Sequence, residues 1–239
     1  MKKLFLVLTA LVMSLTVFAD LKPQRVVVLG DDPMMASDEA LGAVGYATAL
    51  QGLFDDQVTV DVQVSPTLLP DDPAALLEPV LKGDIIMLCK LPLATATEQG
   101  DERVQSDIYA EQLEAIQKAA QKRGAKVIWL TQACPRYFTY DSVQVHRQGV
   151  FPETIRRMCK RDLLPIIDVE QIVFDWLSKQ GLHSSAASFL PMEPAIPAAA
   201  EKASREGLLL NEQGAREVAE LIGEAIRADK KNPLQKRLR

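Results

Sequence analysis

The sequence predicts an α/β fold in which helices flank a doubly wound sheet of about five parallel strands. Short, continuous β-branched runs are typical of strands that are buried on both faces, as in parallel sheets. Stretches with helical periodicity separate these runs, and such alternation predicts right-handed βαβ units. Because no linker-like segment interrupts residues 20–229, they are expected to form one domain.

The first two predicted strands, and a helix between them, come from residues 25–64. The run 25–29 is mostly β-branched and stops at the turn Gly30-Asp31-Asp32-Pro33. Ser37, followed by two acidic residues, predicts the N-cap and first turn of a helix that continues to about Leu53. Valines alternate with other residues over 58–64, which predicts the second strand.

Two more strands and a long helix are predicted between residues 82 and 130. The turn Lys82-Gly83-Asp84 leads into an apolar third strand at 85–88. Apolar residues then recur at helical spacing from Val104 to Ala120, and Gly124 is the expected stop of that helix. The apolar run 127–130 predicts the fourth strand.

The remaining residues predict one short strand and three helices. Pro152 suits the first turn of a helix, and apolar residues lie at helical spacing over 169–177. Between these helices, the segment 164–168 predicts a fifth strand, whose proline indicates an edge position. The last helix is expected from about 211 to 226, followed by a basic tail at 230–239 that frays. This order of elements predicts a flavodoxin-like domain.

The first 19 residues have the pattern of a signal peptide. Lys2 and Lys3 precede an uncharged apolar run, and Val17-Phe18-Ala19 offers small residues where a signal peptidase reads. A transmembrane anchor is the alternative, but the run is shorter than the roughly 20 apolar residues that span a bilayer. We therefore expect cleavage after Ala19, export to the periplasm or out of the cell, and no membrane span in the mature chain.

The charge of the mature chain excludes two classes of partner. Two of the 27 Lys and Arg residues lie in the signal peptide, which has no acidic residue, so the 32 Asp and Glu residues leave a net charge of −7. No dense basic segment offsets this charge. Nucleic acid and anionic membrane surfaces are therefore excluded as expected partners.

The three cysteines, Cys89, Cys134 and Cys159, are too few for a disulfide framework. Three buried free thiols, or one disulfide with one thiol left over, are the two alternatives. None of the three lies in a CxxC motif or beside a histidine in the sequence, so no zinc or redox site is predicted. We expect no metal and no cofactor.

Five short motifs resemble a known enzyme family. They are Val28-Leu29-Gly30-Asp31, Lys82-Gly83-Asp84-Ile85-Ile86, the segment His146–Arg156, Leu164-Pro165-Ile166-Ile167-Asp168 and Asn211-Glu212-Gln213-Gly214-Ala215. In this order they resemble the SGNH (GDSL-type) hydrolase superfamily, and the last three are similar to its rhamnogalacturonan acetylesterase-like branch. The resemblance covers residues 25–226 and implies the predicted α/β fold with carboxylic-ester hydrolysis as the family activity.

The residues on which that activity depends are replaced at the matching positions. By the resemblance, Asp32 takes the place of the nucleophilic serine, and Leu93 that of the asparagine that donates to the oxyanion. Leu209 stands where the general-base histidine is expected, and Glu206 where its orienting aspartate is expected. The family's glycine after the second strand is also missing, because the chain reads Ser65-Pro66-Thr67. Without the base and the oxyanion donors, hydrolysis of the family type loses its machinery.

The sequence therefore predicts an exported, catalytically inactive SGNH-like protein. It would bind a carbohydrate or acylated sugar, or serve as a partner subunit in a homo- or hetero-oligomer. The competing hypothesis is a carbohydrate esterase or acylhydrolase with an unorthodox active site. Ligand contacts are expected at the carboxyl edge of the sheet, from Asp31, Asp32, Lys90, Arg136, Tyr137 and His146. No histidine is expected to hydrogen-bond Asp32, and Leu93 and Leu209 are expected to pack where the family has polar groups.

Overall fold

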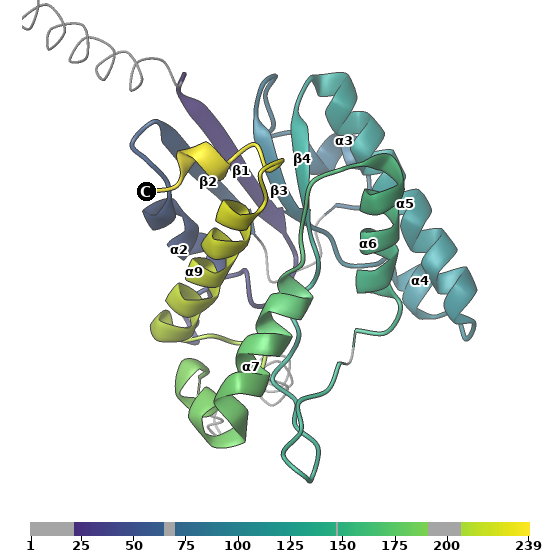
Figure 1. Cartoon of the computed structure of the whole chain (residues 1–239). Helices are drawn as coiled ribbons and strands as arrows, with labels where there is room; N and C mark the ends of the chain where they lie inside the picture. The colour runs from purple at the N-terminus through teal and green to yellow at the C-terminus, as the bar shows by residue number, and fades with distance from the viewer. Residues whose placement is uncertain (1–21, 65–69, 147, 191–206) are drawn as a thin grey trace, which may run out of the picture.

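A five-stranded parallel sheet in the order β2-β1-β3-β4-β5 forms the centre of the structure (Figure 1). The computed structural model describes residues 22–64, 70–146, 148–190 and 207–239. The strands are β1 Gln24–Gly30, β2 Val58–Val64, β3 Ile85–Cys89, β4 Lys126–Leu130 and β5 Ile166–Ile167. The predicted fold class and the predicted strands are confirmed, and β5 lies at the edge that its proline indicated. The signal peptide, Ser65-Pro66-Thr67 and Glu206 lie outside the described residues.

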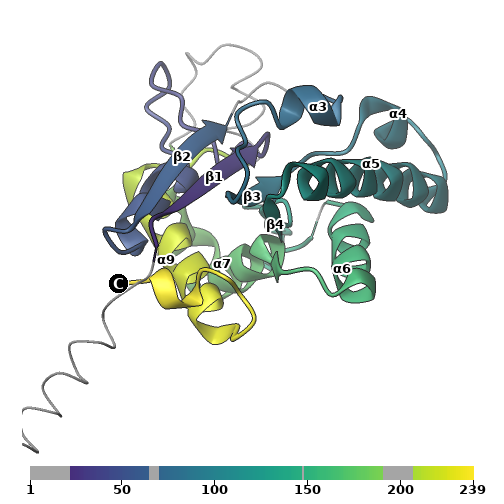
Figure 2. The ribbon, with the colours of Figure 1, turned by 90° about the horizontal axis from the view of Figure 1, so that it is seen from above.

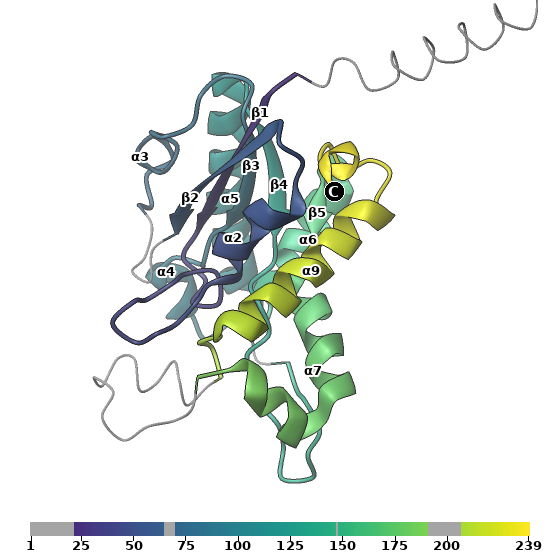
Figure 3. The same ribbon diagram turned by 90° about the vertical axis from the view of Figure 1, so that its left-hand side faces the viewer.

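Helices cover both faces of this sheet (Figures 2 and 3). One face carries α2 (Tyr46–Ala49), α7 (Val169–Ser185) and α9 (Glu212–Ala228), and the other carries α3 (Pro73–Leu76), α5 (Glu102–Arg123) and α6 (Phe151–Asp162). Alternate residues of β1 serve the two cores: Val26 and Val28 pack with the first group of helices, and Val27 and Leu29 with the second. Burial on both faces explains why this strand is continuously apolar. Among the described residues, no helix is long and apolar enough to cross a membrane.

Several short helices complete the described chain. They are the helix α4 (Ala94–Thr97) and the 3-10 helices η1 (Leu50–Leu53), η2 (Ala186–Ser188) and η3 (Gln235–Arg237). The ends of the long helices follow from local capping. The side chains of Asp101, Asp168 and Asn211 accept backbone N–H groups in the first turns of α5, α7 and α9. Gly124 ends α5 in the left-handed conformation, at φ 76°, as its sequence position predicted.

The helix predicted over 37–53 is wrong in its first half. Helical structure begins only at Tyr46, and the preceding residues form a loop. The carboxylate of Asp38 accepts the backbone N–H groups of Ala40 and Leu41, and Asp38 pairs with Ala43 in an antiparallel bridge. An aspartate that bonds its own neighbouring backbone competes with the helix, and here the turn wins.

The expected fraying of residues 230–239 is also wrong. After α9 the chain turns back against the domain: Leu234 is fully buried, and Leu238 forms a bridge with Phe54. The guanidinium of Arg237 donates to the backbone carbonyl of Lys22. The prediction of fraying depended on the basic residues of this segment, whereas Leu234 and Leu238 between them decide its packing.

Candidate functional site

The carboxyl edge of the sheet is where the fold brings the candidate residues together. In the order 2-1-3-4-5, ligands bind at the switch point between β1 and β3, where the chain leaves the two strands toward opposite faces. Gly30 at the end of β1 pairs with Cys89 at the end of β3. Asp31 and Asp32 follow the first strand and Lys90 follows the second, so all three lie at the switch point.

Asp32 is fully buried and joins the end of β1 to the end of β4. One carboxylate oxygen accepts the backbone N–H of Met34 at 2.8 Å, and the other accepts that of Ala133 at 2.6 Å. Burial raises the pKa of Asp32 to about 6, although the two backbone N–H groups act in the opposite direction. The only other hydrogen-bond contact of its side chain among the described residues is the thiol of Cys89, at 4.0 Å. As predicted, neither His146 nor His183 hydrogen-bonds it.

Asp31 and Lys90 form a buried ion pair beside it. The ammonium Nζ of Lys90 lies 2.8 Å from Oδ2 of Asp31, and each side chain is 1% exposed. Oδ1 of Asp31 accepts the backbone N–H of Leu91 at 2.6 Å, and the hydroxyl of Tyr109 donates to the carbonyl of Lys90. All three side chains are buried, and their expected contact with a ligand at the rim stays a prediction. Asp32 bonds to the backbone, and Lys90 pairs with Asp31 and lies 3.6 Å from Oδ1 of the exposed Asp71.

Arg136 and Tyr137 begin a hairpin that follows β4. The guanidinium of Arg136 donates to Ser185 Oγ at 2.9 Å and lies 5.6 Å from the centre of the Phe138 ring. A second nitrogen donates to the carbonyl of Leu182, so this arginine ties the hairpin to the end of α7. Its predicted donation to a ligand stays a prediction. Tyr137 is exposed, as a stacking residue would need to be.

A second polar cluster surrounds His146. Its Nδ1 hydrogen-bonds Glu170 Oε1, and its ring stacks on Phe174 with centroids 3.8 Å apart. Arg156 pairs with the other oxygen of Glu170 and with both oxygens of Asp168, at 2.7 and 2.8 Å. These carboxylates raise the pKa of Arg156 above its ordinary value, Asp168 most strongly. The sequence pattern indicated His146 but not Glu170, for which no local motif gave a signal.

Cys134 lies at the buried side of this cluster. All three cysteines are free and buried, which decides between the two alternatives left open by the sequence. Burial raises the pKa of the Cys134 thiol to about 11, and the nearby Glu170 adds to the shift. Gln144 Nε2 lies 3.4 Å from its sulfur. The thiol is therefore protonated at neutral pH and is a weak nucleophile by itself.

Solved structures with the same architecture identify the fold. The protein YxiM from Bacillus subtilis superposes with a TM-score of 0.63 at 16% identity over 86% of this chain, which spans 57% of that protein's length. An acetyl xylan esterase, AlAXEase, matches with a TM-score of 0.55 at 18% identity, covering 84% of this chain and 98% of the enzyme. A protein described as a GDSL-like lipase, from Parabacteroides merdae, matches with a TM-score of 0.54 at 13% identity, over 85% and 95% of the two chains. The fold is that of the SGNH (GDSL-type) esterases.

Sequence comparison adds nothing to this likeness. No protein-family model matches the chain, and no curated protein matches its sequence. Identities of 13–18% show the SGNH fold alone and do not carry over an activity.

Of the positions that the resemblance assigned to SGNH catalysis, Asp32, Leu93 and Leu209 lie in the part of the chain that the structure describes. Leu209 is 8% exposed, as predicted, whereas Leu93 is half-buried and begins the short helix α4. The backbone N–H of Leu93 donates to Gln112 Oε1 at 3.3 Å. Asp32, at the position assigned to the serine, has both oxygens engaged by backbone N–H groups. Among the described residues, the carboxylate of Asp32 therefore links segments of this edge of the sheet through backbone hydrogen bonds.

Proposed function

We propose that the protein is an exported, catalytically inactive protein of SGNH fold that binds carbohydrate. The loss of activity is inferred from the burial and the hydrogen bonds of Asp32. It is fully buried, and each of its oxygens accepts a backbone N–H. A serine-type mechanism needs an exposed hydroxyl beside a general base, and the described surroundings of Asp32 supply neither.

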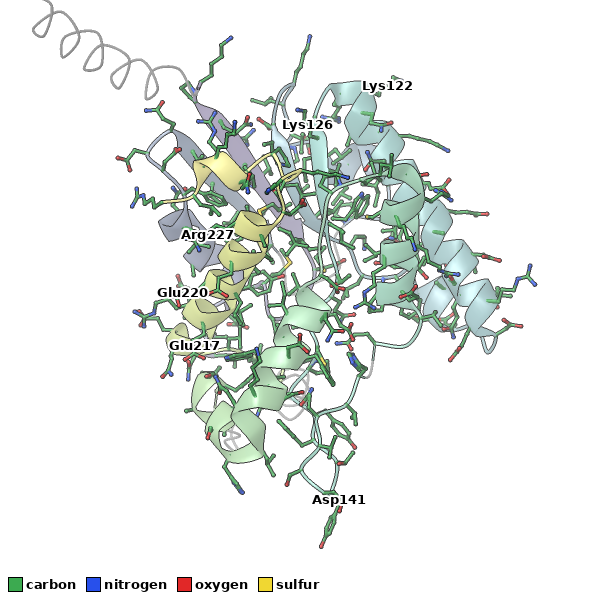
Figure 4. All side chains as sticks on the ribbon, in the orientation of Figure 1. Lys122, Lys126, Asp141, Glu217, Glu220 and Arg227 are labelled. Atoms are coloured by element: carbon green, nitrogen blue, oxygen red, sulfur yellow. The ribbon has the colours of Figure 1, made fainter. Side chains whose placement is uncertain are left out.

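The hairpin after β4 supports the binding part of the proposal. Tyr137 and Tyr140 are both exposed, and bonds between Thr139 and Val143 and between Val145 and Tyr137 hold the hairpin together. Its tip at Asp141 extends away from the helices (Figure 4). Exposed tyrosines on a fixed hairpin suit stacking against sugar rings. That two structural neighbours are an acetyl xylan esterase and a GDSL-like lipase makes polysaccharides and acylated sugars the first ligands to test.

The absence of hydrolysis is the first expectation to test. The purified protein should hydrolyse neither p-nitrophenyl acetate nor acetylated pectin above the buffer rate, and a serine-directed phosphonate should not label it. Asp32→Ser, once shown by circular dichroism to be folded, should be equally silent because the base and oxyanion donors are missing. Only the triple variant Asp32→Ser/Leu93→Asn/Leu209→His is expected to gain a rate. Turnover by the wild-type protein, or by Asp32→Ser alone, would show that the site is active.

Binding is the second expectation. Acetylated pectin or acetylated xylan cast into a native gel should retard the wild-type protein, and Tyr137→Ala should weaken the retardation. Tyr137→Phe is the matched control, because phenylalanine keeps the stacking face and loses only the hydroxyl. If neither polysaccharide retards the protein, carbohydrate binding is refuted. A role as partner subunit, visible as co-migration with a second protein, would then be the better hypothesis.

One observation favours an enzyme with an unorthodox site as the second candidate. His146 is half-exposed and hydrogen-bonds the buried carboxylate of Glu170, which is the arrangement of a general base and its orienting group. The nearby thiol of Cys134 is fully buried, and its pKa is raised to about 11, so an activated nucleophile is missing from this pair. Hydrolysis that disappears in His146→Gln and persists in His183→Gln would favour this candidate over the binding protein.

A further inference from the structure

Three side chains with metal-binding atoms meet beside α7. Cys134 comes from the loop after β4, His146 from the segment before α6, and Glu170 from the first turn of α7. One donor atom from each residue lies within 4.8 Å of the others. Among the described residues, this is the one group of three or more such side chains that close together. The three residues come from separate segments, and their spacing in the sequence matches no metal-binding motif.

The chemistry of the three donors selects for zinc. A cysteine sulfur, an imidazole nitrogen and a carboxylate oxygen bind Zn²⁺ at about 2.3, 2.0–2.1 and 2.0–2.2 Å. Tetrahedral ligands at those lengths lie roughly 3.3–3.7 Å apart, which small side-chain rotations would reach from the observed separations. Ca²⁺ and Mg²⁺ prefer shells made of oxygen atoms, so the sulfur and nitrogen donors disfavour them.

Outer contacts hold Glu170 and His146 in position. The second oxygen of Glu170 pairs with Arg156, and the backbone N–H of Glu170 donates to Thr131 Oγ1 at 2.8 Å. The ring of His146 lies at 10° to that of Phe174, with 3.8 Å between centroids. Hydrogen bonds and packing of this kind orient the side chains that bind a metal ion and raise their affinity for it.

The local charges would balance around a divalent ion. A thiolate at Cys134 and the carboxylate of Glu170 neutralise two positive charges, and Arg156 is balanced by Asp168, which it contacts through two hydrogen bonds. Cys134 and Glu170 are buried, whereas the side chain of His146 is 47% exposed. A bound ion would therefore be closed on the protein side and open to water on the histidine side. Three protein ligands with one open position is the arrangement of catalytic zinc sites.

We propose that Cys134, His146 and Glu170 form a Zn²⁺ site with one coordination position open to solvent. This revises the expectation from the sequence that the protein has no metal ligands. The inference does not depend on the proposed function, since metal binding and carbohydrate binding are measured separately and either can fail alone.

The direct test uses the full chain without an affinity tag, reduced, stripped with EDTA and desalted. Titration of Zn²⁺ against a chromophoric chelator should show one equivalent bound. Co²⁺ added in place of Zn²⁺ should give a thiolate-to-cobalt charge-transfer band, which reports a cysteine ligand. If no equivalent binds, or if the cobalt spectrum lacks the thiolate band, the proposal is overturned. Neither measurement depends on a variant.

Variants then assign the ligands. His146→Gln and Glu170→Gln should each weaken Zn²⁺ binding at least tenfold, on the scale that even supporting residues reach. Cys134→Ser should also abolish the cobalt band. The matched controls are His183→Gln, an exposed histidine outside the cluster, and Cys159→Ser, a buried cysteine in α6; both should bind as the wild type does. His146 is half-exposed, so its variant should fold, and wild-type affinity in a folded His146→Gln protein would refute the site.

Discussion

Replacing Asp32 with alanine is expected to lower the free energy of unfolding by about 3 kcal/mol at pH 7. The substitution leaves the backbone N–H groups of Met34 and Ala133 without their acceptor, and a buried N–H without a partner costs about 1–3 kcal/mol. It also removes the link between the ends of β1 and β4. The measurement is the urea dependence of unfolding, followed by the fluorescence of the two tryptophans and by circular dichroism.

The same variant should be more damaging at lower pH. Burial raises the pKa of Asp32 from 3.8 to about 6, so the folded protein holds this proton more tightly than the unfolded chain does. Protonation of Asp32 therefore stabilises the folded state. This contribution to the free energy of unfolding is fully present below the ordinary pKa of 3.8 and is lost as the pH rises through about 6. Asp32→Ala abolishes it, so the loss of stability at pH 5 should exceed that at pH 7 by roughly 1 kcal/mol.

Asp101→Ala provides the matched control. Asp101 also accepts two backbone N–H groups, those of Arg103 and Val104, but it is exposed at the start of α5. Water can replace the lost acceptor there, so its removal should cost about 1 kcal/mol at pH 7, as for other helix caps. If Asp32→Ala costs no more than Asp101→Ala, the carboxylate of Asp32 is not the structural link that its bonds indicate.

Local sequence patterns were sufficient to predict the strands and the long helices. The run in β1 is apolar because both of its faces are buried, and Gly124 stops α5 because its left-handed conformation suits glycine. The helix predicted from Ser37 was wrong because the side chain of Asp38 satisfies the backbone of a turn instead. A capping pattern reports which bonds are available locally and cannot tell a helix from a turn that uses the same bonds.

The site was only partly predictable for a different reason. The strand ends located Asp31, Asp32 and Lys90 at the switch point, but the depth at which they are buried depends on segments distant in sequence. The bond from Ala133 to Asp32 spans 101 residues. Likewise, Cys134, His146 and Glu170 have no spacing that marks a metal motif, and only the packing of two loops against the start of α7 brings them together. Burial and long-range contact, rather than residue type, decide what these side chains do.

Replacing Lys90 with methionine is expected to destabilise the protein by about 3–5 kcal/mol. The substitution keeps most of the side-chain volume but leaves the carboxylate of Asp31 buried without the ammonium that lies 2.8 Å away. Removing one partner of a buried ion pair typically costs this much, because the remaining charge is uncompensated. The urea midpoint and slope of Lys90→Met and the wild type give the comparison.

Two further variants test whether the cost of Lys90→Met comes from the burial of its pair with Asp31 or from the loss of any charge. Lys118→Met removes the cation of a surface pair with Glu114, whose atoms lie 3.8 Å apart, and should cost no more than about 0.5 kcal/mol. Asp31→Asn/Lys90→Met removes both buried charges, while the amide oxygen can still accept the N–H of Leu91. The double variant should therefore be more stable than Lys90→Met alone, because no single charge is left buried.

If Lys90→Met is as mild as Lys118→Met, water reaches Asp31 when the lysine is removed. The switch point would then be an open cleft able to take a ligand, and the hairpin that carries Tyr137 would no longer be the first place to look for binding.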